Sequence, residues 1–213
     1  MKRVKLKNTK LNVSKLCFGA GRMQILKPKA GGKLLKESYD QGITFWDTSD
    51  DYGTHGHVKE GLKLVPRKNI VLITKITNVF GEKKVKNHIK KMLKELGTKY
   101  IDILLLHAVD SEEALKKYLS IIPILKKIKA IKHIGLSSHK PSIISKIADN
   151  KDIELVMAPY NYRGFRIRGS YRDKAYSSRR GKMKKVLKKC KKNKKDIVLI
   201  KILANGKIKN IEK

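Results

Sequence analysis

The stretch Ile43-Thr44-Phe45-Trp46-Asp47 is the first of three apolar runs in this chain that end on an ionisable residue. The second run is IVLITK at residues 70–75, and the third is IDILLLH at residues 101–107. All three are rich in β-branched or aromatic residues, which is typical of strands covered on both faces, as in a parallel sheet. Loop and helix signals follow each run, so the pattern indicates repeated strand–helix units.

The three runs place Asp47, Lys75 and His107 at strand ends, and in a parallel barrel the carboxyl ends of the strands meet at one rim. Tyr52 follows Asp47 in a turn rich in Gly and Asp, so we expect its hydroxyl within hydrogen-bond or one-water reach of Lys75. A carboxylate, an ammonium, a phenol and an imidazole around one pocket suit proton transfer. Each residue alone also has an ordinary explanation, such as a helix cap, a surface lysine, a packing ring or a core histidine.

Strand and helix signals alternate after an N-terminal hairpin at residues 4–13, which is typical of βαβ units and a parallel sheet. The Gly-rich dinucleotide fingerprint is absent after the first strand, which favours an α/β fold of the (β/α)8 TIM-barrel type over an open sheet. We expect one domain over residues 1–213. The expected strands are residues 16–18, 43–48, 70–76, 100–107, 133–136, 155–161 and 197–202, and the expected helices are 33–41, 58–65, 82–96, 111–128, 141–148 and 183–193.

The barrel is expected to be incomplete, with about seven βα units, because eleven residues follow Ile202. An open barrel has two bare strand edges, which invite pairing with another chain. A fragment, a frameshifted product, a subunit completed by an oligomer and a degenerate relative all remain open. We expect helices to bury most apolar side chains of residues 197–202, and Asn205-Gly206 to form a turn.

Composition limits the possible partners. The net charge of +34 attracts polyanions, but the lysines are spread over predicted helix faces and no specific nucleic-acid motif is present. A solvated basic surface is therefore preferred, with polyanion binding as a lesser alternative. No apolar run reaches the roughly 18 residues of a membrane helix, and the N-terminus lacks the apolar core of a signal peptide. Cys17 and Cys190 lack metal-ligand spacing and indicate free thiols in a cytoplasmic protein, and no metal site is expected.

Several motifs, in order along nearly the whole chain, resemble the aldo-keto reductase family. They are residues 11–19 (LNVSKLCFG), residues 42–53 (GITFWDTSDDYG), Thr74-Lys75, residues 96–102 (LGTKYID) leading to His107, and residues 134–137 (IGLS). Tyr160-Asn161 and residues 200–206 (IKILANG) resemble the sixth and seventh strand ends of a bacterial and archaeal branch of that family.

The resemblance implies a TIM barrel that reduces an aldehyde or ketone with NADP or NAD as cofactor. It implies Asp47, Tyr52, Lys75 and His107 as catalytic residues, the same four that the strand ends select. Tyr52 would donate a proton to the developing alkoxide, and Lys75, held by Asp47, would lower the Tyr52 pKa. His107 would orient the carbonyl oxygen of a small-molecule substrate.

The same resemblance implies cofactor contacts after the later strands. The residues at these positions are Ser137, Ser138, Asn161, Lys201 and Leu203. The family holds the nicotinamide carboxamide with a Ser-Asn pair and a Gln, but here Ser138 and Met157 stand at the Asn and Gln positions. Met157 cannot make the amide contacts. A weakened or inactive relative, lacking the C-terminal cofactor-binding part, is therefore the alternative to an active enzyme.

The remaining polar residues support weaker expectations. The loop at residues 162–180 is either a phosphate-binding segment or a solvated loop. Its arginines are Arg163, Arg166, Arg168, Arg172, Arg179 and Arg180. His55 and His57 are expected in a loop and His88 on a basic helix, whereas His139 follows the fifth strand and could face the pocket.

Overall fold

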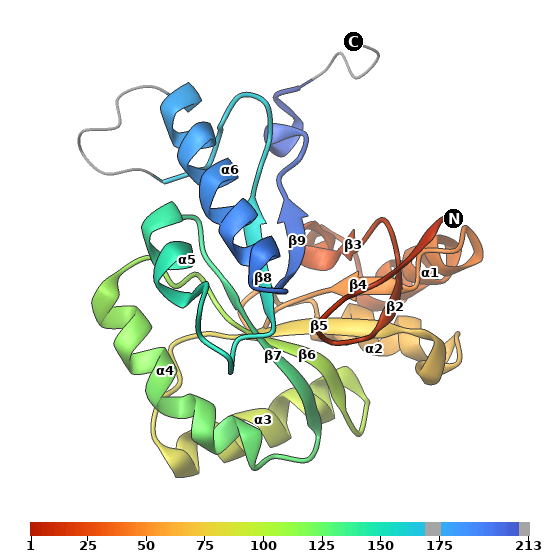
Figure 1. The fold of residues 1–213 in the computed structure, drawn as a ribbon. Helices are drawn as coiled ribbons and strands as arrows, with labels where there is room; N and C mark the ends of the chain where they lie inside the picture. Colours follow the sequence, from red (N-terminus) through yellow and green to blue (C-terminus); the bar gives the residue numbers. More distant parts are fainter. Residues whose placement is uncertain (169–175, 209–213) are drawn as a thin grey trace.

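The computed structural model describes residues 1–168 and 176–208, and in them a parallel sheet has the order β3-β4-β5-β6-β7-β8-β9. The strands are β3 (Phe18–Gly19), β4 (Phe45–Asp47), β5 (Val71–Ile76), β6 (Ile101–Leu106), β7 (Ile131–Ser137), β8 (Leu155–Pro159) and β9 (Asp196–Ile200). The sheet curls, and the helices lie along its outer side (Figure 1). The predicted incomplete (β/α)8 barrel is confirmed.

Helices connect the strands, and local sequence signals set most of their ends. They are α1 (Pro28–Asp40), α2 (His55–Lys63), α3 (Glu82–Leu96), α4 (Glu112–Lys126), α5 (Pro141–Ile147) and α6 (Tyr176–Lys192), with 3-10 turns η1 (Ala20–Ile25), η2 (Arg67–Asn69) and η3 (Ala204–Gly206). The Ser111 side chain caps α4 by accepting from the Ala114 N–H at 3.0 Å. Gly97 ends α3 in the left-handed conformation, at φ 63°.

Three helices begin earlier than the sequence pattern indicates. One is α6, which begins at Tyr176 instead of residue 183, so the predicted loop at residues 162–180 ends before Tyr176. The helix predicted from residue 33 begins at Pro28, whose fixed φ suits a first helical turn. His55 and His57 lie in the first turn of α2, so the loop prediction is wrong. Both are buried, because His55 bonds to Glu95 and Thr74 and His57 bonds to the Leu26 carbonyl.

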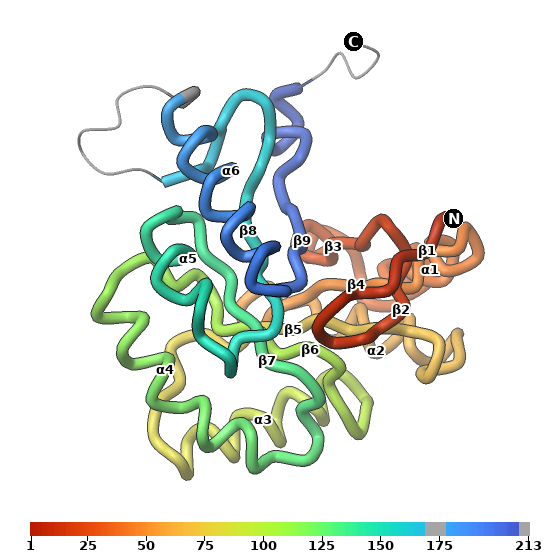
Figure 2. Tube along the Cα trace, in the orientation of Figure 1, coloured from red at the N-terminus to blue at the C-terminus, as the bar shows by residue number. Residues whose placement is uncertain are grey.

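Two apolar layers flank the sheet, one under the helices and one inside the barrel. The hairpin of β1 (Arg3–Lys5) and β2 (Asn12–Ser14) packs against the inner layer through Leu6, Leu11 and Val13. Its turn is bound to the start of β9, because Asp196 accepts hydrogen bonds from the backbone of residues 7–9 at 2.7 to 3.0 Å. The chain trace can be followed in Figure 2. Since the hairpin occupies the amino end of the strands, the carboxyl ends are left for a site.

The sheet is open between β3 and β9, which are its two edges in the described residues. The expectation that helices bury residues 197–202 is wrong: Val198 is buried, but Leu199 is 40% and Ile202 56% exposed. The reason is that, within residues 1–168 and 176–208, β9 pairs on one side only, with β8. The predicted turn is present, since Asn205 and Gly206 have φ values of 59° and 81°.

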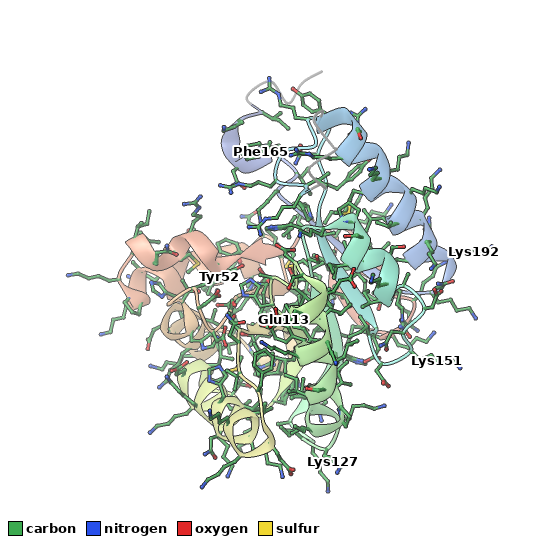
Figure 3. All side chains as sticks on the ribbon, turned by 90° about the vertical axis from the view of Figure 1, so that its left-hand side faces the viewer. Tyr52, Glu113, Lys127, Lys151, Phe165 and Lys192 are labelled. Carbon is green, nitrogen blue, oxygen red and sulfur yellow. The ribbon has the colours of Figure 1, made fainter. Side chains whose placement is uncertain are left out.

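Positive charge is spread over the molecule. Figure 3 labels three lysines at separate places on the periphery: Lys127 after α4, Lys151 before β8 and Lys192 at the end of α6. Tyr52 lies nearer the centre of the view. None of the helices in the described part of the chain combines the length and the apolar composition that crossing a membrane requires. Arg172 lies outside the described residues.

Candidate active site

A buried ion pair lies at the carboxyl ends of β4 and β5. The Lys75 Nζ donates to Asp47 Oδ1 at 2.6 Å and to the Thr48 carbonyl at 2.6 Å. The Lys75 residue is 1% exposed and Asp47 is 8% exposed. Burial disfavours the charged amine, but Asp47 and Tyr52 outweigh it and raise the pKa of Lys75. Lys75 is therefore a fixed, charged ammonium at neutral pH.

Tyr52 lies over this ion pair. The Lys75 Nζ is 4.5 Å from the Tyr52 ring centroid, and the His107 ring meets the Tyr52 ring edge-on at a centroid distance of 5.6 Å. The absence of a side chain at Gly21 leaves room for the ring, because a Cβ there would lie 3.1 Å from Tyr52 Cε2. The structure thus brings the four predicted residues, Asp47, Tyr52, Lys75 and His107, together at the ends of β4, β5 and β6.

Two opposing effects act on the pKa of the Tyr52 phenol: its burial and the positive charge of Lys75. Burial raises the pKa of Tyr52, and the positive charge of Lys75 lowers it without cancelling the effect of burial. The net direction is therefore opposite to that expected from Lys75 alone. A raised pKa keeps Tyr52 protonated at neutral pH, the state in which a phenol can donate a proton.

His107 is held by hydroxyl and carboxylate groups on its Nδ1 side. Nδ1 lies 2.9 Å from Thr77 Oγ1, 3.2 Å from Ser49 Oγ and 3.2 Å from Asp51 Oδ2. The Thr77 hydroxyl gives its one proton to Asp50 Oδ1 at 2.7 Å, so it accepts from His107. Nδ1 consequently carries a hydrogen, and in the neutral ring Nε2 is the hydrogen-bond acceptor. Burial lowers the pKa of His107, although Asp51 opposes the shift.

Asp50 and His88 are site-forming residues that the sequence analysis does not identify. Asp50 accepts from the Thr77 N–H at 2.9 Å and from the Thr77 hydroxyl, and its Oδ2 lies 2.7 Å from His88 Nε2. The loops after β4 and β5 are thereby tied to α3. The adjacent Asp50-Asp51 pair was a visible signal for such a role, whereas the partner His88 comes from a distant helix.

The predicted cofactor residues after β7 differ in availability. Ser138 is occupied, because its hydroxyl donates to Asp110 Oδ1 at 3.0 Å and accepts from the Lys140 N–H at 3.1 Å. Ser137 is buried, and its side chain forms no hydrogen bond within the described residues. Met157 is 1% exposed and apolar. Ser137 and Ser138 therefore differ in how far the protein already uses their hydroxyls.

The predicted cofactor residues at the ends of β8 and β9 also have separate roles. The Asn161 amide nitrogen donates to the carbonyls of Phe165 and Lys201 at 3.0 and 3.1 Å, and its oxygen accepts from the Phe165 N–H at 3.0 Å. Asn161 is therefore a brace between two loops. Leu203 is 44% exposed. Lys201 lies close enough to Asp47 and Lys75 for their charges to act on its pKa.

The fold and the position of these residues define an incomplete (β/α)8 barrel with a candidate site at its carboxyl rim. The profile of the aldo/keto reductase family matches residues 15–213. "Probable aldo-keto reductase 1" of Glycine max is 30% identical over 161 residues, which are 67% of this chain and 46% of the relative. The "Uncharacterized oxidoreductase YqkF" of Bacillus subtilis is 26% identical, over 76% of this chain and 56% of the relative. The chain belongs to the aldo/keto reductase family.

Solved structures show the same fold. The holo form of aldo-keto reductase AKR11C1 from Bacillus halodurans has a TM-score of 0.75 and 22% identity, over 97% of this chain and 68% of that one. The thermostable aldo-keto reductase Tm1743, solved with the inhibitor epalrestat, has a TM-score of 0.74 and 21% identity, over 93% of this chain and 72% of that one. The chain spans about half the length of the curated relatives it matches.

His139 adds a titrating group to the rim. Its Nδ1 lies 4.0 Å from Asp110 Oδ2. Burial and the charge of Lys201 lower the pKa of His139 from 6.5 to about 4, and Asp110 offsets only part of this. Burial also lowers the pKa values of His55 and His107. These histidines are therefore neutral in the folded protein at neutral pH.

Acid is expected to destabilise the protein through these histidines. As the pH falls below about 6.5, the unfolded chain binds protons that the folded chain does not, so stability is lost between about pH 6.5 and pH 4. For His139, whose side chain is 20% exposed, the shift corresponds to about 3 kcal/mol. Urea unfolding at about pH 6.5 and about pH 4 measures this effect. The free energy of unfolding should fall less between the two pH values in His139→Gln than in the parent. An equal loss in both would contradict this assignment.

Proposed function

We propose that this chain reduces the carbonyl group of a small aldehyde or ketone, using NADPH or NADH as the hydride donor. The observation that carries the proposal is the buried Asp47–Lys75 ion pair directly beneath the ring of Tyr52. A lysine in the interior of a protein costs stability unless it is paired, so such a pair under a phenol is a candidate for proton-transfer chemistry.

Tyr52 acts as the general acid in this proposal. When bound, a reduced nicotinamide supplies a hydride to the carbonyl carbon, and the carbonyl electron pair moves to oxygen. The Tyr52 hydroxyl gives that oxygen its proton, and the resulting phenolate is stabilised by the Lys75 ammonium. Asp47 keeps Lys75 charged and in place. A well-placed acid contributes about 10²- to 10⁴-fold in rate.

His107 positions the carbonyl oxygen beside Tyr52. Because the Nδ1 hydrogen is directed at Thr77 and Asp51, a hydrogen bond from Nε2 to the carbonyl oxygen requires the imidazolium form of His107. Since burial lowers the pKa of His107, that form is the minor one at neutral pH and becomes more populated as the pH falls. Asp50 and His88 hold this arrangement through Thr77. The substrate would lie between Tyr52 and His107 at the open end of the barrel.

The cofactor residues fit a nicotinamide in part. The Ser137 hydroxyl would hold the carboxamide, and Lys201 would lie near a phosphate, whereas Ser138 and Asn161 already bind other protein groups. The buried, apolar Met157 offers no amide contact. This shortage of partners favours a second candidate, a family member with weakened or lost reductase activity.

Direct binding distinguishes the two candidates. NADPH and NADH are titrated into the protein while intrinsic fluorescence and thermal stability are followed. Binding at micromolar concentration is expected for the reductase, and no response up to millimolar concentration indicates the weakened relative. Ser137→Ala should weaken binding by about three- to tenfold, the value of one hydrogen bond. The exposed Ser142 of α5 provides the control, and Ser142→Ala should leave affinity unchanged.

A further inference from the structure

The loop after β8 contains a basic surface cavity that the proposed proton-transfer chemistry does not use. The cavity has a volume of about 230 Å³ and is lined by Phe165, Arg166, Ile167, Arg168 and Arg179. The planar guanidinium of arginine matches the oxygens of a phosphate with paired hydrogen bonds. The volume is below the roughly 300–1,000 Å³ of pockets that enclose a drug-sized ligand. The cavity therefore suits one phosphate or diphosphate group.

The cavity is anchored to the rim of the barrel. The Asn161 side chain binds the backbone of Phe165 on one side and of Lys201 on the other. The Arg168 N–H donates to the His139 carbonyl at 2.9 Å. These bonds join the loop to the ends of β7, β8 and β9, next to the catalytic side chains proposed above. Lys201, which Asn161 joins to this loop, lies close enough to Arg166 and to Asp47 and Lys75 for their charges to act on it.

Two cations at this loop, Arg166 and Lys201, make no ion pair with a carboxylate of the described residues. Arg168 pairs with Asp110 at 2.9 Å, but in residues 1–168 and 176–208 no carboxylate lies within ion-pairing distance of Arg166 or Lys201. Lys207 and Arg166 instead lie near the Phe165 ring, at 4.6 and 5.4 Å from its centroid. Burial lowers the pKa of Lys201, and the nearby charges of Arg166 and Lys75 lower it further, whereas Asp47 and Asp110 offset part of the shift.

We propose that Arg166, Arg168 and Lys201 form a binding site for a phosphate group at the mouth of the active site. Either the diphosphate of a dinucleotide or the phosphate of a phosphorylated carbonyl compound would supply it. Only the choice between these sources rests on the proposed reductase function. Phosphate binding itself requires no reductase activity.

Inorganic pyrophosphate is the first probe, titrated into the full chain by calorimetry at constant ionic strength set with chloride. We expect saturation at one site. Arg166→Gln and Lys201→Gln should each weaken binding about tenfold or more, since each removes a charged donor, and Arg166→Lys should have a smaller effect. The matched control is Arg163→Gln, because Arg163 lies in the same loop but contacts Tyr162 and does not line the cavity. Binding that does not saturate, or equal affinity in Arg166→Gln and the parent, would overturn the proposal.

The source of the phosphate is identified by two further measurements. Displacement of pyrophosphate by NADH, together with weaker NADH binding in Arg166→Gln, assigns the site to the dinucleotide. A raised KM for glyceraldehyde 3-phosphate in Arg166→Gln, with the KM for glyceraldehyde unchanged, assigns it to the substrate. Saturable pyrophosphate binding without reduction of either aldehyde would support the phosphate site and count against the reductase function. Reduction of glyceraldehyde without pyrophosphate binding would refute the phosphate site alone.

Discussion

Replacing Tyr52 with Phe is expected to lower the rate of carbonyl reduction by about 10²- to 10⁴-fold, because it removes the proposed proton donor. The ring remains, so its contacts with Lys75 and His107 and its packing over Gly21 are kept. Dinucleotide affinity should therefore change little. The measurement is steady-state turnover of an aldehyde together with a dinucleotide titration of the same variant.

Tyr39→Phe is the matched control for this substitution. The Tyr39 hydroxyl accepts from Asn69 Nδ2 at the end of α1, away from the rim. Loss of the Tyr39 hydroxyl should leave turnover unchanged. Full activity in Tyr52→Phe would exclude Tyr52 as the acid, whereas equal losses in both variants would indicate a general effect on folding.

Replacing Lys75 with Met should destabilise the fold by about 3–5 kcal/mol, because it leaves the Asp47 carboxylate buried without its cation. The unpaired Asp47 would be neutralised by a rise in its pKa, and burial already raises that pKa in the parent. A raised folded-state pKa means that the folded variant binds a proton before the unfolded chain does. The difference in free energy of unfolding between Lys75→Met and the parent should therefore become smaller as the pH falls. Urea unfolding at several pH values measures this.

Two variants separate the buried charge from other effects. Lys75→Met combined with Asp47→Leu should recover most of the lost stability, since an apolar pair leaves no uncompensated charge. Lys117→Met on α4 makes the same change in an exposed ion pair with Glu113, and should change the free energy of unfolding little, because water screens that pair. If Lys75→Met lost no more stability than Lys117→Met, the result would contradict a buried Asp47–Lys75 ion pair. Turnover should collapse in Lys75→Met, because the phenolate of Tyr52 loses its stabilising cation.

The elements that could be predicted from the sequence are those that local signals determine. Apolar runs of β-branched residues identified the strands, and Ser111 and Gly97 marked helix ends through bonds with their own neighbours. The grouping of Asp47, Lys75 and His107 was also predictable, because parallel strands bring their carboxyl ends to one rim. None of this required knowledge of a contact between distant residues.

The features that the sequence did not predict depend on distant partners. His55 is buried because Thr74 and Glu95 satisfy both of its nitrogens, and neither residue is near it in the chain. Asn161 was assigned to the cofactor on resemblance, but its amide groups are used by Phe165 and Lys201. Leu199 is 40% exposed because β9 is an edge strand in the described residues; the open edge was predicted from the sequence, but its effect on this side chain was not.

The bonds between the N-terminal hairpin and Asp196 have a consequence for the order of folding. They join residues separated by 187 to 189 positions, so the hairpin cannot complete its native contacts until the β9 segment is available. At the pace of synthesis, about 5–20 residues per second, the hairpin lacks its bonds to Asp196 for roughly ten seconds or more after it leaves the ribosome. During that time the apolar contacts of Leu6, Leu11 and Val13 with the earlier strands are what hold the hairpin, so it is attached less firmly than in the finished fold.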